Sequence, residues 1–569
     1  MHLGLQSMFF KYVWSYPSWQ QHAQATSTKQ FDLTCCRRDT TALQAVVCSD
    51  DPFVLTVNND PFFWKAGSVP IGRIEVALDE AIPVQVQLVG LIPDDHDDPT
   101  SDILLDQTHI YVEGKKLQQV WIECTTTEDV PPGIYHGSVR LYTHSLFEDE
   151  QLQEECRFTI TVKEPVMPRP AEYRFFLNIW QHHSNIARKY QVALWSDEHF
   201  SILEQYMSSL AALGQKAATL IVSEIPWSGQ RSFYDREPSD LFEYNMVGIT
   251  KAPDGHFVYD FATIDRYVAL AETYGMTQEI EVLGLINIWQ APEAGYGSIV
   301  AGDPDAIRLR YYDATTRAYK FIREGAELDA YIHALEAHFI EKGWIEHIRI
   351  TADEPENFAL FQQQWEHIQQ VAPSLKLKVA INHAEFIERG VTGIYDAVPN
   401  FACATQQHQK LMASRSQLPG KLFYYVCCSP RYPNTLIASP SLECRLLPWL
   451  VERLQLDGFL RWAYTAWPDQ PLTKISYRPT IWPAGDMCFV YPGARGKPLL
   501  SLRYKWLERG IKDYELMQIA KQADRTGWVE QLLDGVFLFQ DASTIRSDTP
   551  AEKLFSYQLE DYERLLLEW

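Results

Sequence analysis

Over about 300 residues after position 170, short apolar runs alternate with longer amphipathic stretches, which limits the chain to few folds. The runs predict strands, and the stretches predict helices because their apolar residues recur at about every 3.6 positions. Eight strand–helix units fit a (β/α)8 barrel, whereas a doubly wound open sheet has the same periodicity and stays an alternative. Strands are predicted at 173–180, 217–224, 279–289, 345–351, 376–381, 401–405, 421–426 and 458–463, and helices at 198–213, 261–274, 306–342 and 357–371.

The first 165 residues have a different pattern. Short runs such as 53–57 and 84–89 alternate apolar and polar residues and are separated by turn residues, which is typical of a β-sandwich. Three prolines between positions 165 and 170 indicate a stiff linker. The predicted fold class is therefore a multidomain α/β protein with an all-β module. It consists of a sandwich at 1–165, a TIM-like barrel at 171–490 and a helical C-terminal extension at 491–569.

Charge and hydropathy exclude several kinds of partner. With 50 Lys and Arg against 74 Asp and Glu, the formal charge of −24 disfavours nucleic acid and anionic membranes. No run approaches the roughly 18 apolar residues of a membrane helix, so no membrane insertion is expected. The N-terminus lacks the basic and apolar regions of a secretory signal, and we expect a cytoplasmic protein. The sequence leaves open whether the chain forms a homo-oligomer.

Cofactors and metals have no sequence signature here. Nucleotide-binding glycine motifs and the G-x-S-x-G elbow are absent. The ten cysteines include the adjacent pairs Cys35–Cys36 and Cys427–Cys428, but no CxxC or zinc spacing, and we expect reduced thiols. His182 and His183 are adjacent on a predicted strand and should point apart, which is poor geometry for a metal. We predict neither a metal nor a cofactor.

The most informative segment is Asp353-Glu354-Pro355, which follows an apolar run. In a barrel, the carboxyl end of a strand faces the active site, and proline ends the strand's hydrogen-bond ladder. Acidic residues beside proline are also common at the start of a helix, so both interpretations stay open at this point.

Adjacent carboxylates suit one kind of glycoside hydrolysis. In the substrate-assisted scheme, the 2-acetamido oxygen of the sugar attacks its own anomeric carbon. Asp353 would hold the acetamido N–H, and Glu354 would act as general acid and then general base. Glu354 would need a raised pKa, to which the neighbouring negative charge contributes.

The segment resembles the catalytic pair of glycoside hydrolase family 123, the β-N-acetylgalactosaminidases. Further motifs of that family follow in order: Gly-Phe-Leu-Arg-Trp-Ala-Tyr at 458–464, Trp-Pro-Ala-Gly-Asp at 482–486, Tyr-Pro-Gly at 491–493, Ser-Leu-Arg-Tyr at 501–504 and Glu-Arg-Gly-Ile-Lys-Asp-Tyr-Glu at 508–515. The resemblance implies hydrolysis of a terminal β-linked 2-acetamido sugar, GalNAc, with retention. Thr465-Ala466 stands where the family often has Asn after the tyrosine, which bears on the choice of substrate.

Aromatic and polar residues at predicted strand ends are the candidates for binding a carbohydrate substrate. Aromatic residues make up 13% of the chain, and each ring either stacks on the sugar or packs in the core. Trp462 and Tyr464 alternate on the eighth strand and are expected to share one face. Trp227 and His383 also lie near predicted strand ends, and Tyr424 and Tyr425 both lie on the seventh strand. The substrate-binding candidates are Trp180, His182, Glu224, Asn382, Tyr424, Trp462, Tyr464, Trp467, Trp482 and Asp486.

Two other functions remain open. A glycosidase for a sugar without the acetamido group would need a second carboxylate on another strand, and Glu224 is the nearest candidate. A carbohydrate-binding barrel without catalysis is the third interpretation. The charges on the helix around Arg503 and Asp513 are expected to form an exposed face over the barrel rim.

Overall fold

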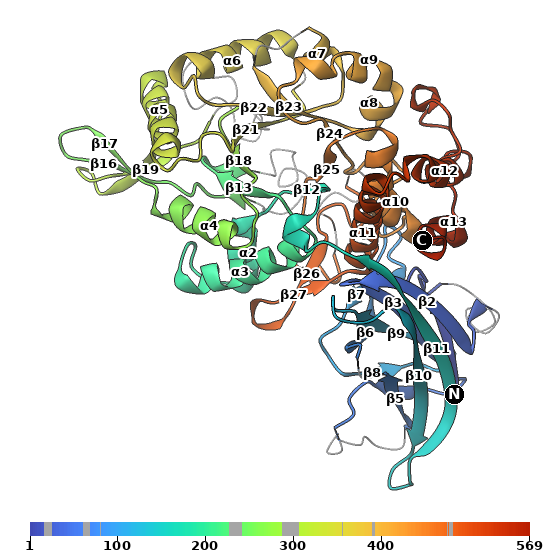
Figure 1. Cartoon of the computed structure of the whole chain (residues 1–569). Helices are drawn as coiled ribbons and strands as arrows, with labels where there is room; N and C mark the ends of the chain where they lie inside the picture. Colours follow the sequence, from blue (N-terminus) through green and yellow to red (C-terminus); the bar gives the residue numbers. More distant parts are fainter. Residues whose placement is uncertain are drawn as a thin grey trace.

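The computed structural model describes residues 1–15, 26–60, 69–79, 81–226, 242–286, 307–355, 357–389, 393–474, 476 and 482–569. These residues form an N-terminal region rich in strands and an α/β body, and the C-terminal helices lie beside both (Figure 1).

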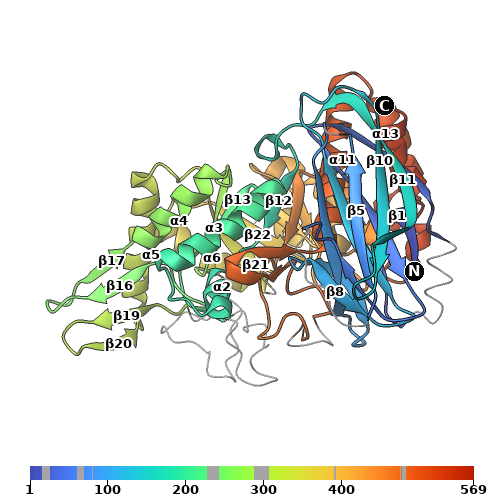
Figure 2. The same cartoon turned by 90° about the horizontal axis from the view of Figure 1, so that it is seen from below.

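The N-terminal region consists of two sheets packed on one core, seen side by side in Figure 2. Alternate residues such as Leu43, Val120, Val139 and Ile160 are fully buried between the sheets, as the period of two in the sequence predicts. One sheet has the order β1 (His2–Ser7), β3 (Thr40–Cys48), β9 (Leu117–Thr125), β6 (Val84–Pro93), β7 (Pro99–Leu104). The other has the order β2 (Gln30–Arg37), β11 (Gln151–Val166), β10 (Gly133–His144), β5 (Ile71–Leu78), β4 (Phe53–Thr56), β8 (His109–Val112).

The α/β body contains two parallel sheets, and the strands of the larger one follow one another in chain order. The five-stranded sheet comprises β13 (Ala217–Ile221), β18 (Glu279–Leu283), β21 (Ile348–Asp353), β22 (Leu377–Ile381) and β23 (Ile394–Pro399). The three-stranded sheet has β25 (Gly458–Arg461) between β12 (Phe176–Ile179) and β24 (Phe423–Tyr425). Single parallel bridges join Leu177 to Gln215, Ala397 to Leu422 and Asn400 to Tyr425, so each sheet reaches the other at both edges.

Helices cover the outer side of these strands (Figure 1). They are α2 (His183–Tyr190), α3 (Asp197–Ala212), α4 (Ala262–Thr273), α5 (Gly325–Glu341), α6 (Phe358–Val371), α7 (Glu385–Glu388), α8 (Phe401–Gln406), α9 (His408–Ala413) and α10 (Ser441–Arg453). The C-terminal helices are α11 (Leu502–Gln522), α12 (Thr526–Val536) and α13 (Leu559–Leu567). Smaller strands are β14 (Ile225–Pro226), β15 (Phe242–Glu243), β16 (Gly248–Lys251), β17 (Phe257–Asp260), β19 (Arg310–Asp313), β20 (Ala318–Phe321), β26 (Val490–Pro492) and β27 (Pro498–Leu500).

Two predicted elements were wrong. The strand expected at 401–405 is helix α8, because the side chain of Asn400 caps its start by accepting from the N–H of Cys403. The corresponding strand is β23, just before it. The helix expected at 306–342 is only α5, because β19 and β20 first form a hairpin that joins the small sheet projecting in Figure 1.

The charges of α11 are buried, in contrast to the exposed face expected from sequence. Arg503 pairs with Asp102 of β7 at 2.8 Å, and Arg509 pairs with Asp39 at 3.0 Å. All four side chains are at most 5% exposed. The helix therefore joins the N-terminal region to the α/β body through ion pairs that water does not screen.

Candidate active site

The two predicted catalytic carboxylates lie at the carboxyl end of β21. Ile348, Ile350 and Ala352 are fully buried along the strand, which ends at Asp353. Glu354 adopts a left-handed backbone conformation with φ 45°, and its N–H donates to the carbonyl of Ala380 at 3.1 Å. Such a conformation costs a non-glycine residue of order 1–3 kcal/mol and is concentrated at functional sites. Both carboxylates are half-buried, so neither belongs to the core.

The alternative of a helix start does not describe this segment. Helix α6 begins at Phe358, and its N-cap is Asn357, whose side chain accepts from the N–H of Leu360 at 3.0 Å. Asp353 belongs to the strand before that cap. The acidic pair therefore ends a strand and does not cap a helix.

Tyr425 holds one of the two carboxylates. Its hydroxyl donates to Oε1 of Glu354 from the end of β24. Burial, followed by the charge of Glu354, raises the pKa of Tyr425 well above its ordinary value, so the phenol keeps its proton and remains a donor. Its neighbour Tyr424, predicted as a substrate-binding residue, donates instead to the carbonyl of Leu447 in α10 at 2.8 Å. Adjacent strand residues point to opposite faces, so only one of the two tyrosines can reach the carboxylates.

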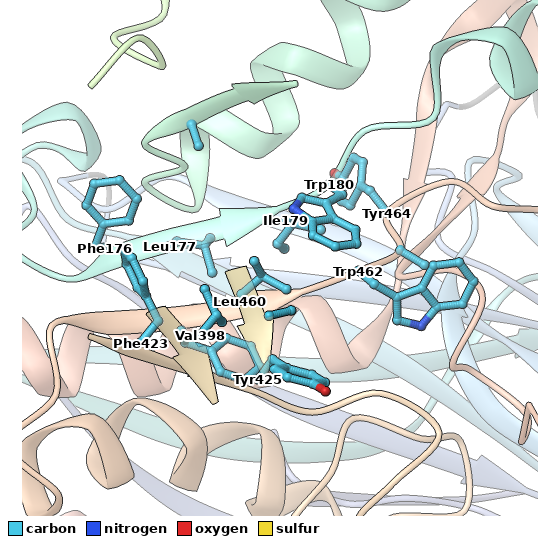
Figure 3. Packing of buried hydrophobic residues seen from close by; sticks show 14 of the residues in the cluster. Phe176, Leu177, Ile179, Trp180, Val398, Phe423, Tyr425, Leu460, Trp462 and Tyr464 are labelled. Atoms are coloured by element: carbon cyan, nitrogen blue, oxygen red, sulfur yellow. The ribbon is translucent and has the colours of Figure 1, made fainter. Parts of the chain in front are cut away.

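A group of aromatic residues follows β12 and β25, whose ends are seen with Trp180, Trp462 and Tyr425 in Figure 3. The Trp462 ring centroid lies 5.8 Å from that of His182 and 6.0 Å from that of Trp482. Its indole N–H donates to Oδ1 of Asp486 at 2.9 Å. Four predicted binding residues are thus brought together, with Trp180 buried at the end of the neighbouring strand.

Burial shifts the pKa of the titratable side chains in and beside this group toward their neutral forms. Burial raises the pKa of Asp486 to about 6, although the charge of Arg461 opposes the shift. Burial lowers the pKa of His182 to about 3 and that of His183 to about 4. At neutral pH both imidazoles are therefore uncharged. Nε2 of His183 lies 2.8 Å from the carbonyl oxygen of Thr219.

Tyr464 and Trp467 do not join the group around Trp462. The Tyr464 hydroxyl lies 2.6 Å from Oγ of Ser209 on α3, and the Trp467 indole N–H donates to the carbonyl of Val490 at 2.8 Å. Both rings are buried and lie against Tyr206 of α3. The expected common face of Trp462 and Tyr464 is absent because β25 ends at Arg461, after which strand alternation no longer applies.

Glu224 forms an ion pair with Arg310, a residue with no predicted role. Nε of Arg310 lies 2.6 Å from Oε1, and Nη2 donates to Oε2 at 3.1 Å. Arg310 comes from β19 of the small sheet, 86 residues away, and no local pattern links the two. Asn382 is half-buried and His383 exposed just after β22, whereas Trp227 lies outside the described residues.

Among the described residues, no three His, Cys, Asp or Glu side chains gather as a metal site. Within the same ranges, no helix has the length and apolar character needed to cross a membrane. The described residues offer a carboxylate pair and a phenol donor, and a group of buried aromatic side chains follows the neighbouring strands β12 and β25. Carboxylic acids exchange protons with an ether oxygen, and aromatic rings pack on the C–H face of a sugar.

Comparisons with known proteins agree with this chemistry. The model of the glycoside hydrolase 123 catalytic domain matches residues 180–520, more than half of the chain. A solved family 123 glycoside hydrolase from Clostridium perfringens, described in terms of glycolipid glycan hydrolysis, has a similar fold. Its TM-score is 0.72 at 17% identity, with 100% of this chain and 96% of that chain covered. A β-D-glucuronidase from Dictyoglomus thermophilum gives a TM-score of only 0.31 at 9% identity, over 77% of this chain and 68% of that one. A search of curated proteins returned no match.

Proposed function

Because this chain belongs to glycoside hydrolase family 123, we propose that it removes a terminal β-linked 2-acetamido sugar, GalNAc, with retention of configuration. The observation that carries this proposal is the pair Asp353 and Glu354, half-buried together at the carboxyl end of β21. The hydrolysis of glycolipid glycans described for the Clostridium perfringens relative supplies the class of natural substrate that we propose for this chain.

The proposed reaction uses the sugar's own amide as nucleophile. The acetamido oxygen bonds to the anomeric carbon while the bond to the leaving oxygen breaks, and Asp353 accepts the acetamido N–H as positive charge develops. Tyr425 occupies Oε1 of Glu354, so Oε2 is the atom that delivers the proton to the leaving group. Glu354 then removes a proton from water, which attacks the anomeric carbon and regenerates the acetamido group.

The pairing of Glu224 argues for this scheme over a protein nucleophile. A retaining glycosidase without substrate assistance needs a second carboxylate about 5 Å from the acid. Glu224 has both oxygens engaged by Arg310 and is almost fully buried. We therefore assign it to holding the small sheet against the end of β13, where it fixes one side of the site.

We also propose that the two parallel sheets work as one (β/α)8 barrel over residues 171–490, with the sandwich at 1–165 and the helical extension at 491–569 as separate domains. The single bridges at both junctions between the sheets support this arrangement. A closed ring would place the carboxyl ends of β12, β21, β24 and β25 around one site, which suits a terminal sugar.

The test compares three nitrophenyl β-glycosides, those of GalNAc, GlcNAc and galactose. We expect release of nitrophenol from the GalNAc compound and none above background from the galactoside, which lacks the acetamido nucleophile. Asp353→Asn should abolish turnover of the GalNAc compound. Equal rates on the galactoside, or a wild-type rate for Asp353→Asn, would show that the amide is not the nucleophile.

A further inference from the structure

Two adjacent cysteines follow the strand that carries Tyr425. Cys427 and Cys428 lie just after β24, and their Sγ atoms are 3.8 Å apart. Both are half-buried, whereas the other eight of the ten cysteines are buried. Cys427 and Cys428 are therefore the most accessible of the ten cysteines, and their sulfur atoms lie in van der Waals contact.

The second adjacent pair provides an internal contrast. Cys35 and Cys36 lie on β2, where neighbouring side chains point to opposite faces. Cys35 is in the core between the two N-terminal sheets, and Cys36 is in the core that faces the α/β body. These two sulfur atoms are thus buried in different cores and cannot meet.

We propose that Cys427 and Cys428 form a redox-active dithiol that hydrogen peroxide closes to a disulfide. One sulfur attacks a peroxide oxygen and breaks the O–O bond, giving a sulfenic acid and one water. The other thiol displaces the sulfenic oxygen as a second water and forms the S–S bond. The two sulfurs lose two electrons in total, and these reduce the peroxide.

A disulfide between adjacent cysteines has a geometry that makes the bond easy to reduce. Adjacent Cα atoms lie about 3.8 Å apart across a trans peptide, whereas disulfide-bonded Cα atoms usually lie about 4.4–6.8 Å apart. Closing the bond therefore distorts the peptide between Cys427 and Cys428. A distorted disulfide is more easily reduced, which is typical of regulatory bonds and not of structural ones.

The distortion is transmitted toward the catalytic carboxylate. The backbone of Cys427 is held at both of its polar groups, because its N–H donates to the carbonyl of Ser429 at 3.0 Å and its carbonyl accepts from Nδ2 of Asn434 at 2.9 Å. Asn434 is itself fixed by Glu443 of α10, which accepts its N–H at 2.8 Å. Closing the S–S bond twists the peptide that follows this anchored residue and displaces it. We expect the displacement to reach Tyr425, two residues upstream, which would then lose its hydrogen bond to Glu354. This consequence for activity rests on the proposed function.

The experiment treats the reduced full-length protein with hydrogen peroxide, blocks free thiols and measures peptide masses. We expect the peptide with Cys427 and Cys428 to lose about 2 Da and the peptide with Cys35 and Cys36 to be alkylated, with dithiothreitol reversing the change. In the same samples, hydrolysis of the aryl GalNAc compound should fall at least about tenfold and recover on reduction. Cys428→Ser, with Cys427→Ser as the second variant, should keep its activity in peroxide.

Several results would overturn the inference. These are the absence of the disulfide from that peptide, equal oxidation of Cys35 and Cys36, or a complete disulfide with unchanged activity. If the reduced protein hydrolyses none of the sugars, the proposed function fails, while the peptide masses still decide whether the dithiol exists.

Discussion

The parallel strands of the α/β body carry charged side chains at both ends, but the two ends are built differently. At the amino ends, Lys378 of β22 pairs with Glu279 and Glu281 of β18 at 2.7 and 2.9 Å, and all three side chains are fully buried. At the carboxyl end of β21, between those two strands, Asp353 and Glu354 are half-buried. The contact to Glu354 comes from a phenol and not from a full charge.

We infer from this difference that the charges at the amino ends stabilise the fold, whereas the carboxylates at the carboxyl end are available for a reaction. A buried charge is tolerated only with its partner, so the amino-end cluster fixes the register of β18 against β22 and can do little else. A half-buried carboxylate held at one oxygen keeps its other oxygen for a substrate. In parallel α/β sheets, ligands bind beyond the carboxyl ends of the strands, where this pair lies.

The largest expected effect concerns Glu354. Glu354→Gln should lower turnover of a natural disaccharide by about 10³–10⁴-fold, because the departing sugar needs a proton, with little change in the free energy of unfolding. The loss should be smaller on a nitrophenyl glycoside, whose leaving group needs little protonation. Glu366→Gln on the exposed face of α6 is the control. An equal loss on both substrates would contradict the role of general acid.

A substitution at the amino ends of the parallel strands should lower the stability of the protein and not its catalytic rate. Lys378→Met leaves Glu281 buried without a cation and Glu279 with Lys421 alone, and should lower the free energy of unfolding by about 3–5 kcal/mol, measured with urea. Lys376→Met, two residues away, is the matched control. Its partner Glu346 is 78% exposed, so we expect this variant to lose at most about 1 kcal/mol of the free energy of unfolding. Similar losses for both variants would mean that the buried cluster does not hold the strands.

The two tyrosines of β24 separate catalysis from packing within one strand. Tyr425→Phe removes the donor to Glu354 and should lower kcat by about 10–100-fold, because hydrogen bonds to charged groups contribute roughly 1.5–3 kcal/mol. Tyr424→Phe removes only the bond to Leu447 and should cost about 1 kcal/mol of stability with kcat unchanged. If kcat falls equally in both, Tyr425 has no special place beside the carboxylate.

The smallest expected effect is a pH dependence of the free energy of unfolding that comes from His199 of α3. Burial lowers the pKa of His199 from 6.5 to about 4, and its Nδ1 accepts from the N–H of Trp195. Between these values the unfolded chain binds a proton that the folded chain excludes, so stability falls as the pH falls. His199→Gln should reduce this slope by about 1 kcal/mol per pH unit, from urea unfolding at pH 6 and pH 5. An unchanged slope would show that His199 is not buried as a neutral group.

The local sequence pattern predicted the alternation of strands and helices and the position of Asp353 and Glu354 at the end of a strand, because both depend on neighbouring residues. The local pattern did not predict ion pairs between residues that are far apart in the sequence. The pairing of Arg503 with Asp102 spans 401 residues, and that of Arg310 with Glu224 spans 86. No periodicity signals either pair, so the burial of α11 and the engagement of Glu224 had to come from the structure.

The different contacts of Tyr424 and Tyr425 could not be predicted from sequence for another reason. Alternation predicts that the two side chains oppose each other, but only the position of the strand within the sheet decides which one faces Glu354. The helix at 401–405 shows the same limit. A short apolar run fits either element, and the capping side chain of Asn400 decides it.

The most direct test of the central claim is inhibition by the thiazoline analogue of GalNAc, which mimics the cyclised amide. If Asp353 and Glu354 catalyse a reaction in which the substrate supplies its own nucleophile, the thiazoline should bind at least about 10²-fold more tightly than GalNAc itself. Asp353→Asn should remove that advantage. A thiazoline that binds no better than GalNAc to an enzyme active on the aryl glycoside would contradict the account.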